Sequence, residues 1–333
     1  MTSTIVEAPK WLPSHMATYA GTSLYEYREF PDICLYYNPL AGEAMQNYYS
    51  LEITPGNGNE ILHRQKEVQS NATQYMSKKF EEFSRVNLIE VAEPFGDGAL
   101  PLLLDAFDKK KLGSYIAVSP DKGINDAAIG FLKRIGMDFY GKLQTHADVV
   151  VEVESNTFGI QIRDALGSSY DSTTVNVFTL MNSRLGNSPD PRLMLKNIYD
   201  SMETGDYFAL QQGIYRSGSE ERLVRDYTTL FSTPNVFVGA KEIGSSLSPE
   251  QDKQSMFRVY WDEDFSGVKA YVTPDRDVSF LNVDLKAGEK IDLFRSKRFQ
   301  ETELKNILKL TGFKIEGVFF DSDEDNALYI LKK

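Results

Sequence analysis

The sequence of 333 residues is poor in side chains that bind metals or form cross-links. Its single cysteine, Cys34, rules out an intramolecular disulfide framework and is typical of a reducing compartment. Its three histidines are scattered, without the i, i+4 spacing that puts two metal ligands on one helical face. We therefore expect a cytoplasmic protein without a metal site.

Long apolar runs and basic stretches are also missing. No segment approaches the roughly 18 uninterrupted apolar residues of a membrane-spanning helix, and the first residues do not resemble a signal peptide. The 48 acidic side chains outnumber the 36 lysines and arginines, which gives a net charge of −12. Such a surface repels phosphate backbones. We expect neither nucleic acid nor a membrane as a partner.

The composition that remains is typical of a packed globular protein, with 41% apolar and 25% charged residues. Because single cores stop growing at about 250–300 residues, we expect more than one lobe. Residues 1–85 are rich in tyrosine and methionine, with helical spacing at 42–49 and 59–85, and predict a helical cap that belongs to a substrate lobe. Residues 86–216 predict a Rossmann-like core, 217–290 an inserted antiparallel β lobe, and 291–333 the completion of the core.

Apolar runs alternate with helical patterns from residue 86 onward. We predict strands at 86–94, 114–120, 147–155, 173–182 and 206–215, with helices between most of them, which indicates a parallel sheet. The chain then ends with a helix closed by Gly312 and two strands joined by the polar turn SDED. An α/β doubly wound sheet that ends in an antiparallel pair is typical of the class I methyltransferase fold, whereas nicotinamide-dependent domains usually continue parallel.

Ligands of open α/β sheets bind beyond the carboxyl ends of the strands. The first strand ends at an acidic, glycine-containing loop, which suits close approach of a cationic sulfonium, although Asp-Gly is also a common turn. The second strand ends at Ser119 and Asp121, where Asp121 is either a ribose ligand or the N-cap of the next helix. The candidate cofactor residues are Glu90, Gly96, Asp97, Gly98, Ser119, Asp121, Asn182 and Ser183.

The candidate substrate residues follow the fourth and fifth strands. Asn187 can both donate and accept hydrogen bonds, so it is either a ligand of an amine or carboxylate or a simple turn residue. Gln212 and Tyr215 close an apolar strand with polar side chains, which indicates either a ligand nearby or a backbone group that needs a partner.

The order of these segments resembles the histidine-specific methyltransferase family of ergothioneine biosynthesis. The segment LPSHMATYAGTSLYEYREFPDICLYYNP resembles that family's opening region, with Tyr36 and Tyr37 as the paired tyrosines. The segment VFTLMNSRLGNSPDP resembles the strand and Gly-Ser-x-x-Gly-Asn loop whose asparagine binds the substrate, which places that role on Asn187. METGDYFALQQG resembles the family's Pro-Gly-Asp strand start, and GEKIDLFRSKRF resembles Ile-x-x-Glu-x-Ser-x-Lys-Tyr, with Ser296 as the substrate serine.

The resemblance implies S-adenosylmethionine as cofactor and a small amino-acid-like molecule as substrate. Tyr37 and Asn187 would orient the reacting amine, and Tyr36, Gln212, Tyr215, Phe294 and Ser296 would line the substrate. Two departures stand out. Phe294 stands where the family has a glutamate that binds the imidazole of histidine. A phenyl ring instead favours an aliphatic, aromatic or cationic side chain. The first glycine loop is interrupted at 92–95, and Ser119 stands where an acid is expected.

These observations favour an S-adenosylmethionine-dependent methyltransferase that acts on the amine of an amino acid other than histidine, as a monomer or homodimer. The altered loop leaves two alternatives. The first is attack on another sulfonium carbon, by aminocarboxypropyl transfer or cyclisation, with release of methylthioadenosine. The second is a catalytically silent protein that binds the cofactor.

Overall fold

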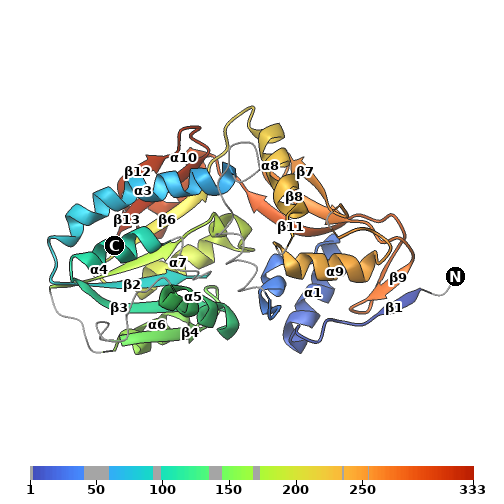
Figure 1. Ribbon diagram of the computed structural model, residues 1–333, viewed down its shortest axis with the longest axis horizontal. Helices are drawn as coiled ribbons and strands as arrows, with labels where there is room; N and C mark the ends of the chain where they lie inside the picture. The colour runs from blue at the N-terminus through green and yellow to red at the C-terminus, as the bar shows by residue number, and fades with distance from the viewer. Residues whose placement is uncertain are drawn as a thin grey trace. The chain divides into compact units, whose positions relative to one another are not determined.

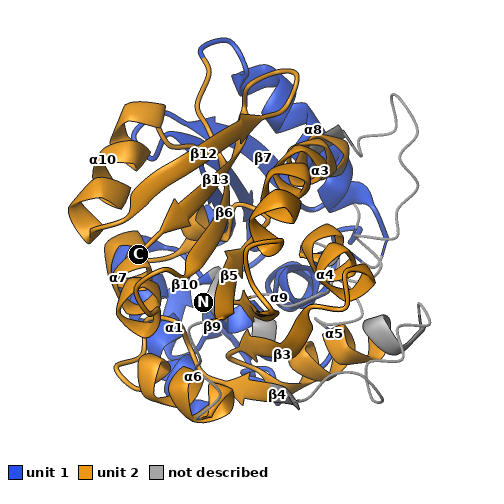
Figure 2. Cartoon of the chain, turned by 90° about the vertical axis from the view of Figure 1, so that its left-hand side faces the viewer, with its two compact units in different colours: residues 1–61, 217–297 blue, residues 62–216, 298–333 orange. Residues whose placement is uncertain are grey.

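A computed structural model describes residues 3–40, 60–92, 99–134, 145–167, 173–234, 236–253 and 255–333. The helix predicted at 42–49 and the loop residues Gly96, Asp97 and Gly98 lie outside these ranges. The chain divides into two compact units, shown in Figure 2. Unit 1 comprises Met1–Ile61 and Ser217–Lys297, and unit 2 comprises Leu62–Arg216 and Arg298–Lys333.

Unit 2 contains a seven-stranded sheet in the order β12-β13-β6-β5-β2-β3-β4 (Figure 1). The strand order reverses between the central neighbours β2 and β5, so the ligand-binding edge is expected at their carboxyl ends. This topology confirms the predicted open sheet with an antiparallel final pair. The five parallel strands are β2 (Arg85–Val91), β3 (Leu112–Ser119), β4 (Thr145–Val150), β5 (Thr174–Leu180) and β6 (Tyr207–Gly213), and the antiparallel pair is β12 (Lys314–Phe320) and β13 (Asn326–Lys332).

Helices cover both faces of this sheet, as the view in Figure 2 shows. Successive residues of a strand point to opposite faces, so Leu88 joins one buried cluster and Ile89 the other. Because both faces are buried, apolar residues occupy positions on both faces of the central strands rather than alternating with exposed polar ones. One face carries α3 (Glu60–Phe80), α4 (Leu100–Asp108) and α5 (Lys122–Arg134), and the other carries α6 (Phe158–Leu166), α7 (Pro191–Ser201) and α10 (Glu301–Thr311).

Unit 1 packs its helices and two small sheets around one apolar core. The first sheet contains β1 (Thr4–Val6), β9 (Val278–Phe280) and β10 (Val283–Leu285), and the second contains β7 (Arg258–Asp262), β8 (Gly267–Val272) and β11 (Ile291–Lys297). The helical elements are α1 (Ser14–Tyr27), the 3-10 helix η1 (Asp32–Tyr37), α8 (Glu220–Ser232) and α9 (Val238–Leu247). No helix in the described ranges is long and apolar enough to cross a membrane.

Four features differ from those that the sequence suggested, and the first is that residues 291–297 (β11) belong to unit 1 rather than to the completion of the core. Helix α3 belongs to unit 2 rather than to a cap, because Val68, Ala72 and Met76 recur at helical spacing and pack with the sheet. The segment from 217 onward begins with helices α8 and α9 and turns into strands only at β7. Strand β4 ends at Val150 instead of 155, because its neighbour β3 ends at Ser119, whose oxygen accepts the last hydrogen bond from the Val151 N–H at 2.9 Å.

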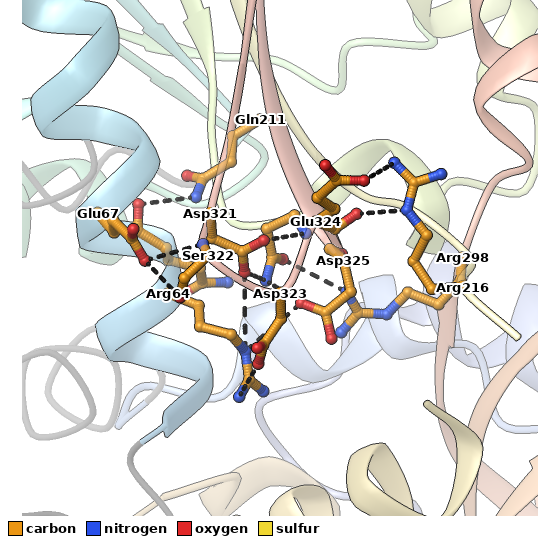
Figure 3. Close-up of polar contacts among 12 residues, drawn as sticks. Arg64, Glu67, Gln211, Arg216, Arg298, Asp321, Ser322, Asp323, Glu324 and Asp325 are labelled. Atoms are coloured by element: carbon orange, nitrogen blue, oxygen red, sulfur yellow. Dashed lines mark hydrogen bonds and ion pairs between the residues drawn. The ribbon is translucent and has the colours of Figure 1, made fainter. Parts of the chain in front are cut away.

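An acidic turn, Asp321–Asp325, joins β12 to β13 and holds a buried ion-pair cluster (Figure 3). Arg64 of α3 lies with its Nε 3.8 Å from Asp321 Oδ2 and 3.5 Å from Asp325 Oδ1. Both carboxylate side chains are fully buried, and the Arg64 side chain is 5% exposed. Asn326 Nδ2 donates to Asp321 Oδ2 at 3.0 Å. The cluster therefore ties the first part of α3 to the last strand pair of the sheet.

This burial makes the acidic turn sensitive to pH. Burial, reinforced by the neighbouring Asp325 carboxylate, raises the pKa of Asp321 to about 6. Because this pKa lies above that of the unfolded chain, Asp321 contributes stability at low pH that is lost as the pH rises from about 4 to 6. We expect Asp321→Asn to flatten the pH dependence of the unfolding free energy in that window, measured by urea unfolding. An unchanged slope would contradict the assignment.

Candidate active site

The loop after β5 follows one of the two strands between which the strand order reverses, and it carries several polar side chains. Asn182 and Ser183 both adopt left-handed backbone conformations, with φ of 60° and 61°, before the 3-10 helix η3 (Arg184–Asn187). Ser183 Oγ and Asn187 Oδ1 are buried and have no hydrogen-bond partner in the part of the chain that the structure describes. Buried polar atoms are nearly always paired, so these two oxygens indicate a place where a ligand or water binds.

Two glutamines of β6 hold this loop. Gln211 and Gln212 are both fully buried, and their side chains lie on opposite faces of the sheet. Gln211 Oε1 accepts hydrogen bonds from Gln69 Nε2 at 2.8 Å and from the Asn182 backbone N–H at 3.4 Å. Gln212 Oε1 accepts from the Gly186 backbone N–H at 3.1 Å. Of the two interpretations of Gln212, the geometry therefore supports the one in which it satisfies a backbone group.

The carboxyl end of β2, where the strand order reverses, carries a buried acid, Glu90. Tyr115 of β3 donates its phenolic hydrogen to Glu90 Oε2 at 2.6 Å. Burial and the neighbouring Glu90 carboxylate raise the pKa of Tyr115 well above its usual value, which keeps the phenol protonated as a donor. Ala92 follows with a φ of 74°, a conformation that glycine adopts without strain. The altered loop therefore retains a glycine-like backbone at its first position.

The end of β3 is occupied by local hydrogen bonds. Ser119 Oγ donates to the Asp121 backbone oxygen at 2.6 Å. Asp121 Oδ1 accepts from the Gly123 N–H at 2.8 Å, at the start of α5. This is the capping role that the sequence also suggested for Asp121. The predicted contacts of these two residues with a ribose stay predictions.

Unit 1 brings two of the predicted substrate residues together. Phe294 and Ser296 lie on the same face of β11, two residues apart. The Phe294 ring lies 5.3 Å, centroid to centroid, from each of the rings of Tyr227, Phe231 and Phe237. Tyr227 and Ser296 share a hydrogen bond of 3.0 Å between their hydroxyl oxygens. Ser296 is thus held beside an aromatic cluster, here defined as Tyr227, Phe231, Phe237 and Phe294.

Three residues of this aromatic cluster, Tyr227, Phe231 and Phe237, were not among the residues predicted from the sequence. Tyr227 and Phe231 lie on α8, and their spacing of four with Leu223 could have predicted a helix with one apolar face. Of the paired tyrosines, Tyr37 packs edge-on against His15 with ring centroids 6.2 Å apart, and Tyr36 lies in η1 but its side chain is outside the described residues. Tyr215 lies in unit 2, where its N–H donates to the Phe299 oxygen at 2.9 Å.

A sequence comparison identifies the family. The profile described as "Histidine-specific methyltransferase, SAM-dependent" matches residues 98–333, which is more than half of the chain. The chain belongs to this family. The enzyme is therefore a methyltransferase that uses S-adenosylmethionine, as predicted. Among curated proteins, none matches its sequence.

Solved methyltransferase structures show a distant likeness. Magnesium protoporphyrin IX methyltransferase from Synechocystis PCC 6803, crystallised with S-adenosylhomocysteine, shares 10% identity over 90% of this chain and 96% of its own, with a TM-score of 0.47. The CurJ carbon methyltransferase shares 14% identity over 95% of this chain and 70% of its own, with a TM-score of 0.44. A methyltransferase from Clostridium acetobutylicum ATCC 824 shares 9% identity over 80% and 91%, with a TM-score of 0.41. With scores this low, the fold assignment rests on the strand order described above.

The described part of unit 2 fits S-adenosylmethionine. Glu90 places a carboxylate at the carboxyl end of β2, where negative charge favours a cationic sulfonium. Ser183 Oγ adds a buried acceptor oxygen at the end of the adjacent strand β5. These groups lie at the sheet edge that binds ligands in open α/β folds.

Proposed function

We propose that this methyltransferase acts on the α-amine of a free amino acid, or of a small amino-acid derivative, whose side chain is not an imidazole. The observation that carries the proposal is the buried Oδ1 of Asn187 at the end of the central strand pair, which has no hydrogen-bond partner among the described residues. A carbonyl oxygen at that position is a hydrogen-bond acceptor, and an amine is a donor. The family's substrate asparagine matches the same position, which supports an amine there.

For methyl transfer, the protein mainly has to align the acceptor amine with the methyl group. S-adenosylmethionine supplies a methyl group that is already activated by the sulfonium. The ammonium group of the amino acid must first lose a proton to solvent, because only the free amine has a lone pair. Asn187 Oδ1 would then accept a hydrogen bond from the amine and so direct its lone pair toward that methyl group. Displacement requires the reacting atoms about 3–3.5 Å apart and in line. Tyr37 and Ser296 would hold the rest of the amino acid, as their match to the family's substrate residues suggests.

The aromatic cluster supports a substrate other than histidine. An imidazole N–H pairs best with a carboxylate, which gives a charge-assisted hydrogen bond. Here Phe294 presents a half-buried ring, packed with three other rings, at the matching position. Such a surface favours aliphatic and aromatic side chains through apolar contact and cationic ones through the ring faces.

The proposal is tested by incubating the purified enzyme with S-adenosylmethionine and each of the twenty L-amino acids, followed by mass spectrometry of both products. We expect S-adenosylhomocysteine and an N-methylated amino acid, with an apolar, aromatic or cationic acceptor faster than histidine. Release of methylthioadenosine would show attack on another carbon and contradict the proposal. So would the absence of any methylated amino acid, or a clear preference for histidine.

Restoring a carboxylate at position 294 should shift the acceptor preference toward histidine. In Phe294→Glu we expect kcat/KM for L-histidine to rise about tenfold or more, because a hydrogen bond to a charged group contributes about 1.5–3 kcal/mol. The matched variant Phe294→Leu keeps the surface apolar and should gain no histidine activity. Steady-state kinetics with both amino acids measure the change. An equal response of the two variants to histidine would refute the role of residue 294 in acceptor choice.

A further inference from the structure

The loop that presents Asn187 is held in a costly backbone conformation. Asn182 and Ser183 are consecutive residues with left-handed backbone, at φ of 60° and 61°, and both carry a Cβ that disfavours this region. Such conformations persist only where the surroundings determine them by other contacts. The loop's own backbone hydrogen bonds close short successive turns, from the N–H groups of Arg184, Gly186 and Ser188 to the oxygens of Met181, Ser183 and Leu185 at 3.0–3.3 Å. Contacts from outside the loop add to these bonds and tie it to the sheet.

Two neighbouring residues of β6 make such contacts. Gln211 reaches the start of the loop at the Asn182 N–H, 3.4 Å away. Gln212 reaches its far side at the Gly186 N–H, 3.1 Å away and one residue before Asn187. Because adjacent residues of a strand point to opposite faces, the loop is held from both sides of the sheet.

A second layer orients Gln211 itself. Its Oε1 accepts from Gln69 Nε2 at 2.8 Å, and its Nε2 donates to the Gln65 backbone oxygen at 3.1 Å, both on α3. Gln69 and Gln65 are each 5% exposed. These bonds fix which end of the Gln211 amide faces the loop, so that an oxygen meets the Asn182 N–H. Helix α3 thus takes part in shaping the loop without belonging to it.

We propose that Gln211 and Gln212 are positioning residues for methyl transfer, which clamp the loop after β5 from both faces of the sheet and so aim Asn187 Oδ1 at the acceptor amine. This rests on the proposed function, because it takes Asn187 as the residue that binds the amine. It assigns Gln212 a role through the backbone rather than contact with substrate. It also brings in Gln211, whose side chain contacts the loop, and Gln69, whose side chain contacts Gln211.

The test is a double-mutant cycle between Gln212→Met and Asn187→Ala in the full-length enzyme. The probe is the L-amino acid that the unmodified enzyme methylates fastest among the twenty. Gln212→Met keeps the length of the side chain but removes the acceptor, and we expect the KM for the amino acid to rise about fivefold to tenfold. The KM for S-adenosylmethionine should rise less than the KM for the amino acid, because Gln212 contacts the loop at Gly186, next to Asn187, whereas the candidate cofactor residues Asn182 and Ser183 lie at the start of the loop.

In the Asn187→Ala background the same substitution should change kcat/KM by less than about twofold, because the residue it positions is gone. A merely structural role would lower activity equally in both backgrounds, and that additive result would overturn the inference. Gln161→Leu is the control, because Gln161 on α6 bonds to Thr157 on the same helix rather than to the loop. It should leave both KM values unchanged.

A second variant covers the case in which Gln212→Met does not fold. Gln69→Met removes the bond to Gln211 from a helix position, and we expect a rise of about threefold in the amino-acid KM that also disappears with Asn187→Ala. The two proposals fail separately. If no amino acid is methylated, or Asn187→Ala leaves the amino-acid KM unchanged, the proposed function fails. If Asn187→Ala impairs the amino acid but the glutamine effects are additive with it, only the positioning role fails.

Discussion

Arg64→Ala is expected to lower the free energy of unfolding by about 3–5 kcal/mol, because it removes the guanidinium that pairs with two buried carboxylates. Asp321 and Asp325 are fully buried, and the guanidinium Nε of Arg64 lies within 4 Å of an oxygen of each. Removing one partner of a buried cluster costs far more than the intact cluster contributes. Urea unfolding at pH 7 measures the difference.

Arg216→Ala is the matched control for this prediction. Arg216 pairs with Glu301 and Glu324 at 3.3 and 3.4 Å, but its side chain is 32% exposed. Exposed ion pairs contribute about 1 kcal/mol or less, so this variant should unfold close to the unmodified enzyme. Adding Asp321→Asn and Asp325→Asn to Arg64→Ala should recover much of the lost stability. A loss below 1 kcal/mol for Arg64→Ala alone would contradict the account of the acidic turn.

Asn187→Ala should lower kcat/KM for the amino-acid acceptor about 10- to 100-fold, the equivalent of about 1.5–3 kcal/mol for a hydrogen bond to a charged or polarised group. Stability should be unchanged or slightly higher, because Asn187 Oδ1 has no partner in the described structure and its removal breaks no internal bond. Steady-state kinetics and urea unfolding on the same preparation give both numbers.

Asn197→Ala provides the opposite pattern. Asn197 Nδ2 donates to the Val153 oxygen at 2.7 Å and to the Ser155 oxygen at 3.2 Å, so its amide is used inside the fold. We expect this variant to lose about 1 kcal/mol of stability with little change in the acceptor KM. If Asn187→Ala loses stability and keeps its acceptor KM, Asn187 is a structural residue and the proposed amine site is wrong.

Much of unit 2 could be predicted from the sequence because its signals are local. Apolar runs of strand length, each followed by a helical pattern, identified β2, β3, β5 and β6, and Gly312 marked the end of α10 with a φ of 110°. The switch from parallel to antiparallel strands at the end of the chain then gave the fold class. The elements of unit 1 were harder to predict. The short alternating strands dominate the pattern of residues 217–290, and the helical spacing of Leu223 and Tyr227 in α8 is a weaker signal.

The sequence by itself determined the fold class, the family, the cofactor and the loop that carries Asn187, because each depends on residues that are close together in the chain. Only the tertiary structure decided what the polar side chains do. In the folded chain, Gln212 accepts a hydrogen bond from a backbone amide, and Asp121 caps a helix. Arg64 pairs with Asp321 in the turn between the last two strands. The physical reason is that a buried polar group must find a partner, and which partner it finds depends on segments that meet only when the sheet is assembled.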